Sequence, residues 1–306
     1  MERRNFLRSA LTPALSRLAL AKRTLPRRRY RDGVELSIIG FGGIVVVGQE
    51  QKRADRTVAD AIERGVNYFD VAPTYGDGEA EIKLGNALVP HRKSIFLACK
   101  TTERSAQGAQ KELEQSLDRL HSDHLDLYQF HAVSSMKDVD QILGPGGAAE
   151  TFLKARQQGK VRYLGCSAHS AEAALALMDR FQLDSILFPV NFVLYEQGKF
   201  GPQILAKAKE KGVARLALKS LAYGKWPEGA RKTYPKCWYQ PVDNRDLASK
   251  ALRFTLSEDI TAAIPPGDER LFEMALSLAS EFKPLSPAER QALLAGTAGV
   301  EPIFRA

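Results

Sequence analysis

Four side chains that can hold or transfer protons follow three neighbouring apolar runs of the sequence. Asp70 ends the run VNYFD, Lys100 ends FLACK and His131 ends LDLYQFH. Tyr75 comes five residues after Asp70, in a turn that contains two glycines. An ammonium beside a phenol stabilises the phenolate, and a carboxylate keeps that ammonium charged. The set is therefore suited to giving a proton to a carbonyl oxygen that hydride attack turns into an alkoxide.

Each of these residues also has an ordinary structural explanation. A lysine at a strand end is usually a solvated cap, a lone histidine usually completes a hydrogen-bond network, and Asp-x-x-x-x-Tyr is too short a motif to be specific. If all four lie at one rim of a barrel, a catalytic role is favoured over these structural explanations, because the active sites of parallel barrels lie at the carboxyl ends of the strands. We therefore expect Asp70 to pair with Lys100, and Lys100 to lower the pKa of Tyr75. His131, neutral or charged, is expected to hydrogen-bond a substrate oxygen.

The segments that must position these side chains alternate between strand and helix patterns. Continuous apolar runs are typical of strands buried on both faces of a parallel sheet, and apolar residues recur at helical spacing between them. The expected strands are residues 36–41, 66–70, 94–100, 125–131, 161–167, 185–191, 213–219 and 260–264. Helical patterns include residues 106–120, 147–158, 171–181, 202–211 and 245–256. Eight such units predict an α/β fold, a (β/α)8 TIM barrel.

A turn signal lies just before the first of these strands. Asp32-Gly33 stands between β-favouring residues in RRRYRDGVELS, which predicts a β-hairpin that closes the bottom of the barrel. The alternative fold is a doubly wound open sheet. Its glycine fingerprint is missing, because Gly40-Phe41-Gly42-Gly43 has the wrong spacing.

Composition excludes several classes of protein. Of 306 residues, 44% are hydrophobic, and no apolar run approaches the roughly 20 residues that span a bilayer. The net charge of +8 resides in residues 1–31, which hold ten basic residues and one acidic residue. The remaining 34 basic and 35 acidic residues nearly cancel, so the body offers no basic face for nucleic acid. Cys99, Cys166 and Cys237 are widely spaced, which argues against a metal site or a disulfide framework. The hydride would then come from an organic cofactor.

The N-terminus resembles a twin-arginine export signal. Arg3-Arg4 is followed by Phe6-Leu7 and a small, apolar stretch with an A-x-A site at residues 19–21. Arg17 and Pro13 interrupt that stretch. We expect residues 1–25 to form a basic leader outside the core and residues 26–306 to form the barrel. The favoured location is the periplasm, which the protein would reach through the export machinery. The alternative is that the protein stays in the cytoplasm and carries a basic surface arm.

The body of the sequence resembles the aldo-keto reductase family. The matching segments, in order, are DVAPTYG with its continuation GEAEIKLGNAL, FLACKT, DHLDLYQFHA and GKVRYLGCSAHS. The resemblance identifies Asp70, Tyr75, Lys100 and His131 with the catalytic tetrad of that family. It implies a (β/α)8 barrel that binds a nicotinamide cofactor across the carboxyl-end rim. It also implies that Tyr75 is the proton donor and that His131 orients the carbonyl.

The cofactor-binding side departs from the family pattern. Ser167-Ala168 stands in place of the usual Ser-Asn, and Leu218 replaces the tyrosine that commonly stacks on the nicotinamide. The segment 264–270, IPPGDER, resembles the phosphate-binding turn that opens the last helix. The family favours NADP(H), but Asp268 and Glu269 leave NAD(H) open, with Arg270 as the nearby compensation. The expected cofactor-binding residues are Gly42, Gly43, Ser167, Asn191, Leu218, Lys219, Ser220, Gly267 and Arg270.

A long loop after the seventh strand is rich in aromatic residues. It runs AYGKWPEGARKTYPKCWYQP and is either a lid over the cofactor or substrate, or a loop anchored by its own aromatics. His169, Trp226 and Trp238 are the candidate substrate-binding residues.

Two functions of different classes follow from these patterns. The first is an NAD(P)H-dependent oxidoreductase that reduces an aldehyde or ketone to an alcohol, or runs the reverse reaction, with Tyr75 as proton donor. The second is a cofactor-binding regulatory module on the same barrel with little turnover, which the altered nicotinamide contacts motivate. No nucleic-acid partner and no transmembrane segment are expected.

Overall fold

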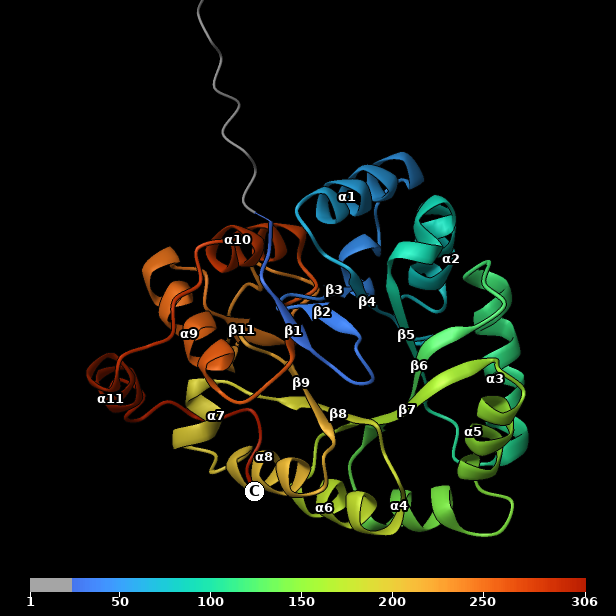
Figure 1. The fold of residues 1–306 in the computed structure, drawn as a ribbon. Helices are drawn as coiled ribbons and strands as arrows, with labels where there is room; N and C mark the ends of the chain where they lie inside the picture. The colour runs from blue at the N-terminus through green and yellow to red at the C-terminus, as the bar shows by residue number, and fades with distance from the viewer. Residues whose placement is uncertain (1–23) are drawn as a thin grey trace, which may run out of the picture.

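Eight parallel strands form a barrel in the computed structural model, which describes residues 24–306 (Figure 1). In order round the barrel they are β3 (Phe41–Gly42), β4 (Tyr68–Asp70), β5 (Phe96–Thr101), β6 (Leu125–Val133), β7 (Val161–Ala168), β8 (Ser185–Pro189), β9 (Ala214–Leu218) and β12 (Ala262–Ile264). A parallel bridge between Ile39 and Ala263 brings the two ends of the sheet together. The predicted (β/α)8 barrel is confirmed.

Helices cover the outside of the barrel. The main ones are α1 (Gln51–Glu63), α2 (Glu79–Leu88), α3 (Ala106–Arg119), α5 (Ala148–Gln157), α6 (Ala171–Arg180), α8 (Pro202–Glu210), α9 (Arg245–Ser257) and α10 (Glu269–Ala279). Shorter helical segments are η1 (Gly43–Val46), η2 (Val89–Ser94), α4 (Met136–Leu143), α7 (Phe192–Glu196) and α11 (Pro287–Ala295). No helix among residues 24–306 has the length and apolar character needed to cross a membrane.

The alternation of side chains along the strands gives two separate apolar cores. One set of positions packs between the sheet and the helices. The other set, which includes Tyr68, Ala98 and Leu127, fills the inside of the barrel. Successive strand residues point to opposite faces of the sheet, so residues two apart share the barrel interior.

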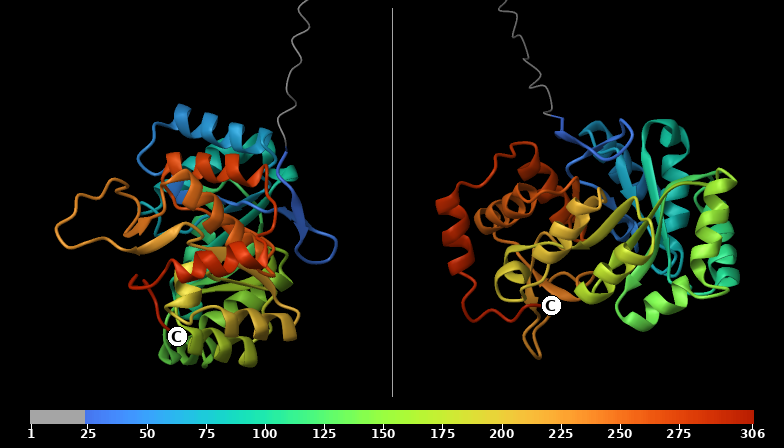
Figure 2. Two further views of the ribbon diagram at one scale, coloured as in Figure 1. Left: turned by 90° about the vertical axis from the view of Figure 1, so that its left-hand side faces the viewer. Right: turned by 60° about the horizontal axis from the view of Figure 1, so that its bottom comes forward.

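The predicted hairpin is present, and it closes the bottom of the barrel. β1 (Arg27–Arg29) pairs antiparallel with β2 (Glu35–Ser37) around Asp32 and Gly33, whose φ angles of 49° and 79° are those of a tight hairpin turn. Tyr30 packs edge-on against Phe96 in the inner core, at a ring-centroid distance of 5.1 Å. In Figure 2 the hairpin projects from one end of the barrel, and the long loop between β10 (Ala222–Lys225) and β11 (Tyr239–Pro241) projects from the other.

Two boundaries differ from the sequence prediction. The first strand, expected over residues 36–41, is divided: residues 35–37 pair in the hairpin, and only residues 41–42 form barrel strand β3. The pairing with β1 holds the chain at the barrel bottom before it turns up beside β4. Leu25, placed in the leader, is 5% exposed and donates its N–H to the Arg64 carbonyl at 3.1 Å, so the core begins there. The twin-arginine-like motif itself lies outside the described residues.

Candidate active site

The ammonium of Lys100 joins the predicted site residues. It hydrogen-bonds the Asp70 carboxylate, the Val71 carbonyl at 3.1 Å and the Tyr75 hydroxyl at 3.3 Å. Lys100 and Asp70 are 1% and 2% exposed, so this ion pair is inside the barrel. The predicted pairing of Asp70 with Lys100 is confirmed.

Strand register explains why these residues meet. Asp70 on β4 lies opposite Ala98 on β5, and Lys100, two residues further along β5, lies opposite Gln129 on β6. His131 is two residues beyond Gln129 on the same strand and therefore shares its face. The interior positions climb from strand to strand toward the carboxyl-end rim, as the stagger of a barrel requires.

A turn of left-handed residues presents Tyr75 to this group. Gly76, Asp77 and Gly78 have φ angles of 62°, 53° and 91°. A Cβ at Gly76 would lie 3.0 Å from the Val47 side chain, so the turn demands glycine there. Helix α2 begins directly after the turn, at Glu79. The Tyr75 ring stands edge-on to the His131 ring, with 5.7 Å between their centroids.

Asp70 is held by more than Lys100. Its second oxygen accepts hydrogen bonds from the Gln129 amide at 2.9 Å and from the Tyr68 hydroxyl at 3.3 Å. The sequence reading missed both residues. The two-residue alternation of side chains along a strand could have identified them. Tyr68 lies two residues before Asp70, and Gln129 lies two residues before His131, so each shares a strand face with a predicted site residue.

The electrostatic consequence is a lysine that stays charged in the core. Burial alone lowers the pKa of Lys100, but the negative charge of Asp70 and the hydrogen bond to it raise that pKa above its ordinary value. A protonated ammonium therefore stands beside the Tyr75 hydroxyl throughout the physiological range.

The expected lowering of the Tyr75 pKa is wrong. Burial raises the pKa of Tyr75 above its ordinary value, and the nearby Asp70 charge adds to the rise. The charge of Lys100 and its hydrogen bond do lower that pKa, as predicted, but they do not outweigh the loss of water around the phenol. Tyr75 is therefore a protonated phenol at neutral pH, ready to donate.

His131 is a neutral ring. Burial, followed by the positive charge of Lys100, lowers the pKa of His131 to about 2. The sequence left its charge open, and the structure assigns the neutral form. Its Nδ1 is buried and has no hydrogen-bond partner within residues 24–306. Arg104 steadies this strand end by donating to the His131 carbonyl at 2.9 Å.

Two of the expected cofactor-binding residues have structural partners of their own. Ser167 Oγ accepts a hydrogen bond from the backbone N–H of Ala132 at 2.8 Å. Asn191 caps α7 by accepting from the Leu194 N–H at 2.9 Å, and its amide donates to the Lys219 carbonyl at 3.1 Å. Both side chains are 1% exposed, so they hold the backbone of the rim in place.

Among the other expected cofactor-side residues, the three glycines pack closely against neighbouring side chains. A Cβ at Gly43 would lie 2.8 Å from the Val71 side chain, and one at Gly267 would overlap Ile44. A Cβ at Gly42 would reach Ile264 at 3.0 Å. Ser220 Oγ is buried and has no partner within the part of the chain that the structure describes. Leu218 at the end of β9 is only partly buried.

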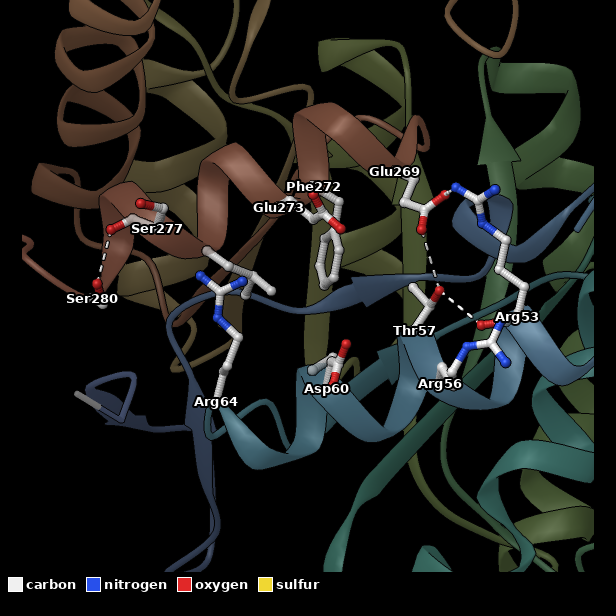
Figure 3. A pocket seen from close by; sticks show the side chains of 12 residues that line it. Arg53, Arg56, Thr57, Asp60, Arg64, Glu269, Phe272, Glu273, Ser277 and Ser280 are labelled. Atoms are coloured by element: carbon white, nitrogen blue, oxygen red, sulfur yellow. Dashed lines mark hydrogen bonds and ion pairs between the residues drawn. The ribbon is translucent and has the colours of Figure 1, made fainter. Parts of the chain in front are cut away.

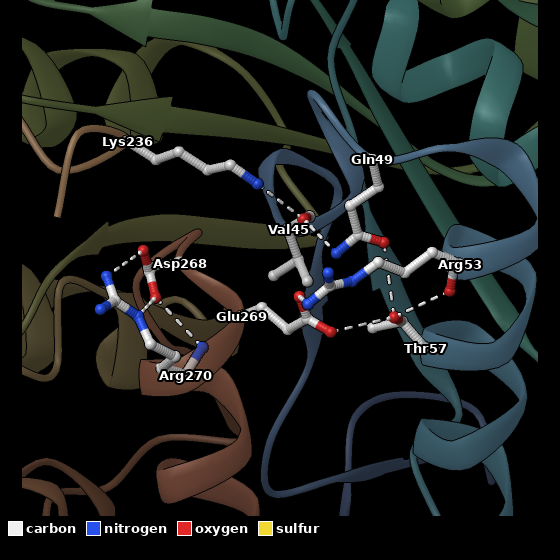
Figure 4. A network of polar contacts seen from close by, with 8 residues as sticks. All are labelled: Val45, Gln49, Arg53, Thr57, Lys236, Asp268, Glu269 and Arg270. Carbon is white, nitrogen blue, oxygen red and sulfur yellow. Dashed lines mark hydrogen bonds and ion pairs between the residues drawn. The ribbon is translucent and has the colours of Figure 1, made fainter.

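Charged residues of both signs surround the start of α10 (Figure 4). Asp268 caps the helix and binds Arg270, with 3.0 Å between the Arg270 Nε and a carboxylate oxygen. Glu269 pairs with Arg53 of α1 at 2.6 Å. From the long loop, Lys236 donates to the Val45 carbonyl at 2.8 Å. Arg270, expected to hold a phosphate, is thus already engaged by Asp268.

A groove of about 640 Å³ lies between α1 and α10 (Figure 3). Arg53, Arg56 and Arg64 line it on the α1 side, and Glu269 and Glu273 line it on the α10 side. No member of the tetrad lines this groove. It adjoins the proposed phosphate-binding turn through Glu269.

The aromatic loop is partly an ordered ribbon. β10 and β11 pair antiparallel, and the Trp226 indole N–H donates to the Cys237 carbonyl at 2.9 Å across the loop. Trp226 therefore links the two sides of the loop. Trp238 is 53% exposed. His169 stacks on Phe304 of the C-terminal segment, with 5.1 Å between ring centroids.

Metal chemistry has no side-chain support in the described part of the chain. Residues 24–306 contain no group of three histidine, cysteine or acidic residues placed to hold a metal. The three cysteines are free and buried.

A model of the aldo/keto reductase family matches residues 39–286. The chain belongs to the aldo/keto reductase family. The aldo-keto reductase YhdN of Bacillus subtilis is 31% identical over 213 residues, which are 63% of this chain and 60% of that protein. The holo form of aldo-keto reductase AKR11C1 from Bacillus halodurans has a TM-score of 0.70 at 23% identity, covering 92% of this chain and all of that one. The aldo-keto reductase from Klebsiella pneumoniae in complex with NADPH has a TM-score of 0.69 at 18% identity, covering 93% and 98%.

Family membership makes the chain an NAD(P)H-dependent oxidoreductase of carbonyl compounds. This is the enzyme that the four strand-end residues predicted. The alternative of a regulatory module without turnover has no support from the relatives.

The two pKa directions predict the pH dependence of the reaction. As the expected proton donor, Tyr75 must carry its proton for reduction, and its raised pKa keeps that proton to higher pH, so kcat for a neutral aldehyde should be constant between pH 5 and 8. Oxidation of the alcohol needs the phenolate and should accelerate as the pH rises. Initial rates in both directions test this. A fall in reduction with a midpoint near the ordinary histidine pKa of about 6.5 would mean that His131 acts as a cation instead.

Proposed function

We propose that the enzyme reduces an aldehyde or ketone by hydride transfer from NADP(H), with Tyr75 as the proton donor. The observation that carries the proposal is the 3.3 Å contact between the Tyr75 hydroxyl and a Lys100 ammonium that is buried and charged. A fixed positive charge next to the phenol favours the phenolate that proton donation leaves behind.

The bound cofactor supplies the hydride, and this chain supplies the proton and the orientation. Neutral His131 places a ring N–H within the same group of side chains, where it hydrogen-bonds the carbonyl oxygen of the substrate. Tyr75 gives its proton to that oxygen as the C–H bond forms and the C=O bond becomes a single bond. Lys100, anchored by Asp70, stabilises the resulting phenolate.

Polar groups at the rim are available to a dinucleotide. Gly43 and Gly267 are required there because Val71 and Ile44 pack directly against them. Ser220 Oγ and His131 Nδ1 are buried polar atoms without a partner in residues 24–306, as groups awaiting a ligand would be. Ser220 and the start of α10 would hold the cofactor, and His131 would contact the substrate.

The proposed preference for NADP(H) rests on charge at the start of α10. Arg53, Arg270 and Lys236 gather there against Asp268 and Glu269, which leaves an excess of positive charge. A 2′-phosphate would take up hydrogen bonds that the arginines now make to the carboxylates. The solved relative in complex with NADPH is consistent with this choice.

The substitution Tyr75→Phe tests the proton donor. It removes only the hydroxyl, so NADPH should still bind while kcat for every aldehyde and ketone falls by about 10²- to 10⁴-fold, the range of general acid catalysis. Carbonyl-dependent NADPH oxidation and NADPH fluorescence titration measure the two effects. Tyr223→Phe, a partly buried tyrosine outside the tetrad, is the matched control. Full activity in Tyr75→Phe would exclude this role.

Titration of the purified protein with NADPH and NADH tests the cofactor preference. NADPH should bind more tightly, and Arg270→Gln should weaken NADPH binding about tenfold while leaving NADH binding nearly unchanged, as expected for the loss of one charge-assisted contact. Arg245→Gln, at the start of α9, is the control. Equal weakening of both cofactors by Arg270→Gln would show that this arginine does not recognise a 2′-phosphate.

A further inference from the structure

The side chain of Lys219 lies among three aromatic rings at the end of β9. Its ammonium is 5.5 Å from the ring centroid of Trp238, 5.8 Å from that of Phe304 and 6.0 Å from that of Tyr239. Trp238 and Tyr239 come from the long loop, and Phe304 comes from the C-terminal segment. Parts of the chain that are far apart in sequence therefore enclose this one cation.

This ammonium has no anionic partner in the protein. Within residues 24–306, no carboxylate pairs with it and no acceptor takes a hydrogen bond from its Nζ, whereas Lys83 and Lys100 each pair with a carboxylate. Aromatic faces attract a cation but accept none of its N–H groups as a carboxylate does. Burial, followed by repulsion from Lys100, lowers the pKa of Lys219 to about 8.

The backbone at this position is also unusual. Lys219 has a φ angle of 62°, in the left-handed region that residues with a side chain seldom adopt. The Asn191 amide and the Ala222 N–H both donate to its carbonyl, at 3.1 and 2.9 Å, and hold it there. Strained residues of this kind cluster at functional sites.

The charge of Lys219 is felt at the reaction centre. Burial, then the charge of Lys219, lowers the pKa of His169, and at His131 Lys219 adds a smaller contribution after burial and Lys100. His169 stacks on Phe304, one of the rings around Lys219. The N–H of His169 donates to the carbonyl of Val133, two residues beyond His131 on β6, at 2.9 Å. Phe304 therefore links the surroundings of Lys219 to the strand end that carries His131.

We propose that Lys219, enclosed by Trp238, Tyr239 and Phe304, binds a carboxylate on the substrate, so that the preferred substrates are carbonyl compounds that carry an acid group. The inference rests on the proposed function, because it places the substrate's carbonyl at Tyr75 and His131. It assigns Lys219 to the substrate, whereas the sequence pattern placed it among the cofactor-binding residues.

Matched pairs of substrates test this assignment. Aldehydes that carry a carboxylate at increasing distance from the carbonyl, such as 4-oxobutanoate and 4-carboxybenzaldehyde, are compared with their neutral primary amides. Wild-type enzyme should favour the best acid over its amide by about tenfold or more in kcat/KM, as a charge-assisted hydrogen bond provides. Lys219→Gln should abolish this ratio, and Lys232→Gln, at an exposed position of the long loop between β10 and β11, should keep it.

The acid-to-amide ratio separates this inference from the proposed function. If neither acids nor amides are reduced, the proposed function fails. If amides are reduced as well as acids, only the role of Lys219 fails. NADPH titration of Lys219→Gln gives a second readout. Weaker NADPH binding with an unchanged ratio would assign Lys219 to a cofactor phosphate, and no change in either would make it an anchor for the loop, so both results would overturn the proposal.

Discussion

The structure depends on an ion pair between Asp70 and Lys100 inside the barrel. Removing two charges from water costs several kcal/mol for each ion, and mutual attraction offsets this only when the remaining polar atoms are also satisfied. Here Gln129 and Tyr68 donate to the second oxygen of Asp70, and the Val71 carbonyl accepts from Lys100. The pair is thus part of the inner core, and Tyr75 contacts Lys100 from the rim side.

The strand register satisfies this constraint. It aligns the interior positions of β4, β5 and β6 and places Lys100 between Asp70 and the rim. The β1–β2 hairpin closes the other end, so water is kept from the pair on that side. The same burial that holds Lys100 beside Tyr75 raises the pKa of the phenol, which makes Tyr75 a weaker acid that is protonated at neutral pH.

The sequence predicted the fold and the meeting of Asp70, Lys100, Tyr75 and His131 because both depend on local patterns. Apolar runs mark strands, and the polar residue ending each run marks the rim. Gln129 and Tyr68 were within reach of the same reasoning through strand parity. The direction of the pKa shift of Tyr75 could not be predicted in this way, because it depends on how much water the folded barrel excludes. The environment of Lys219 was not predictable either, since Phe304 lies far along the chain and reaches it only through tertiary packing.

The most direct test of the Asp70–Lys100 pair is a double-mutant cycle on the free energy of unfolding. Asp70→Asn and Lys100→Met, measured by urea denaturation, should each lower stability by about 3–5 kcal/mol, because each leaves a buried charge uncompensated. The double variant leaves no such charge and should lose much less than the sum of the two. Losses that simply add would show that the two residues do not depend on each other and would contradict the central role of the pair.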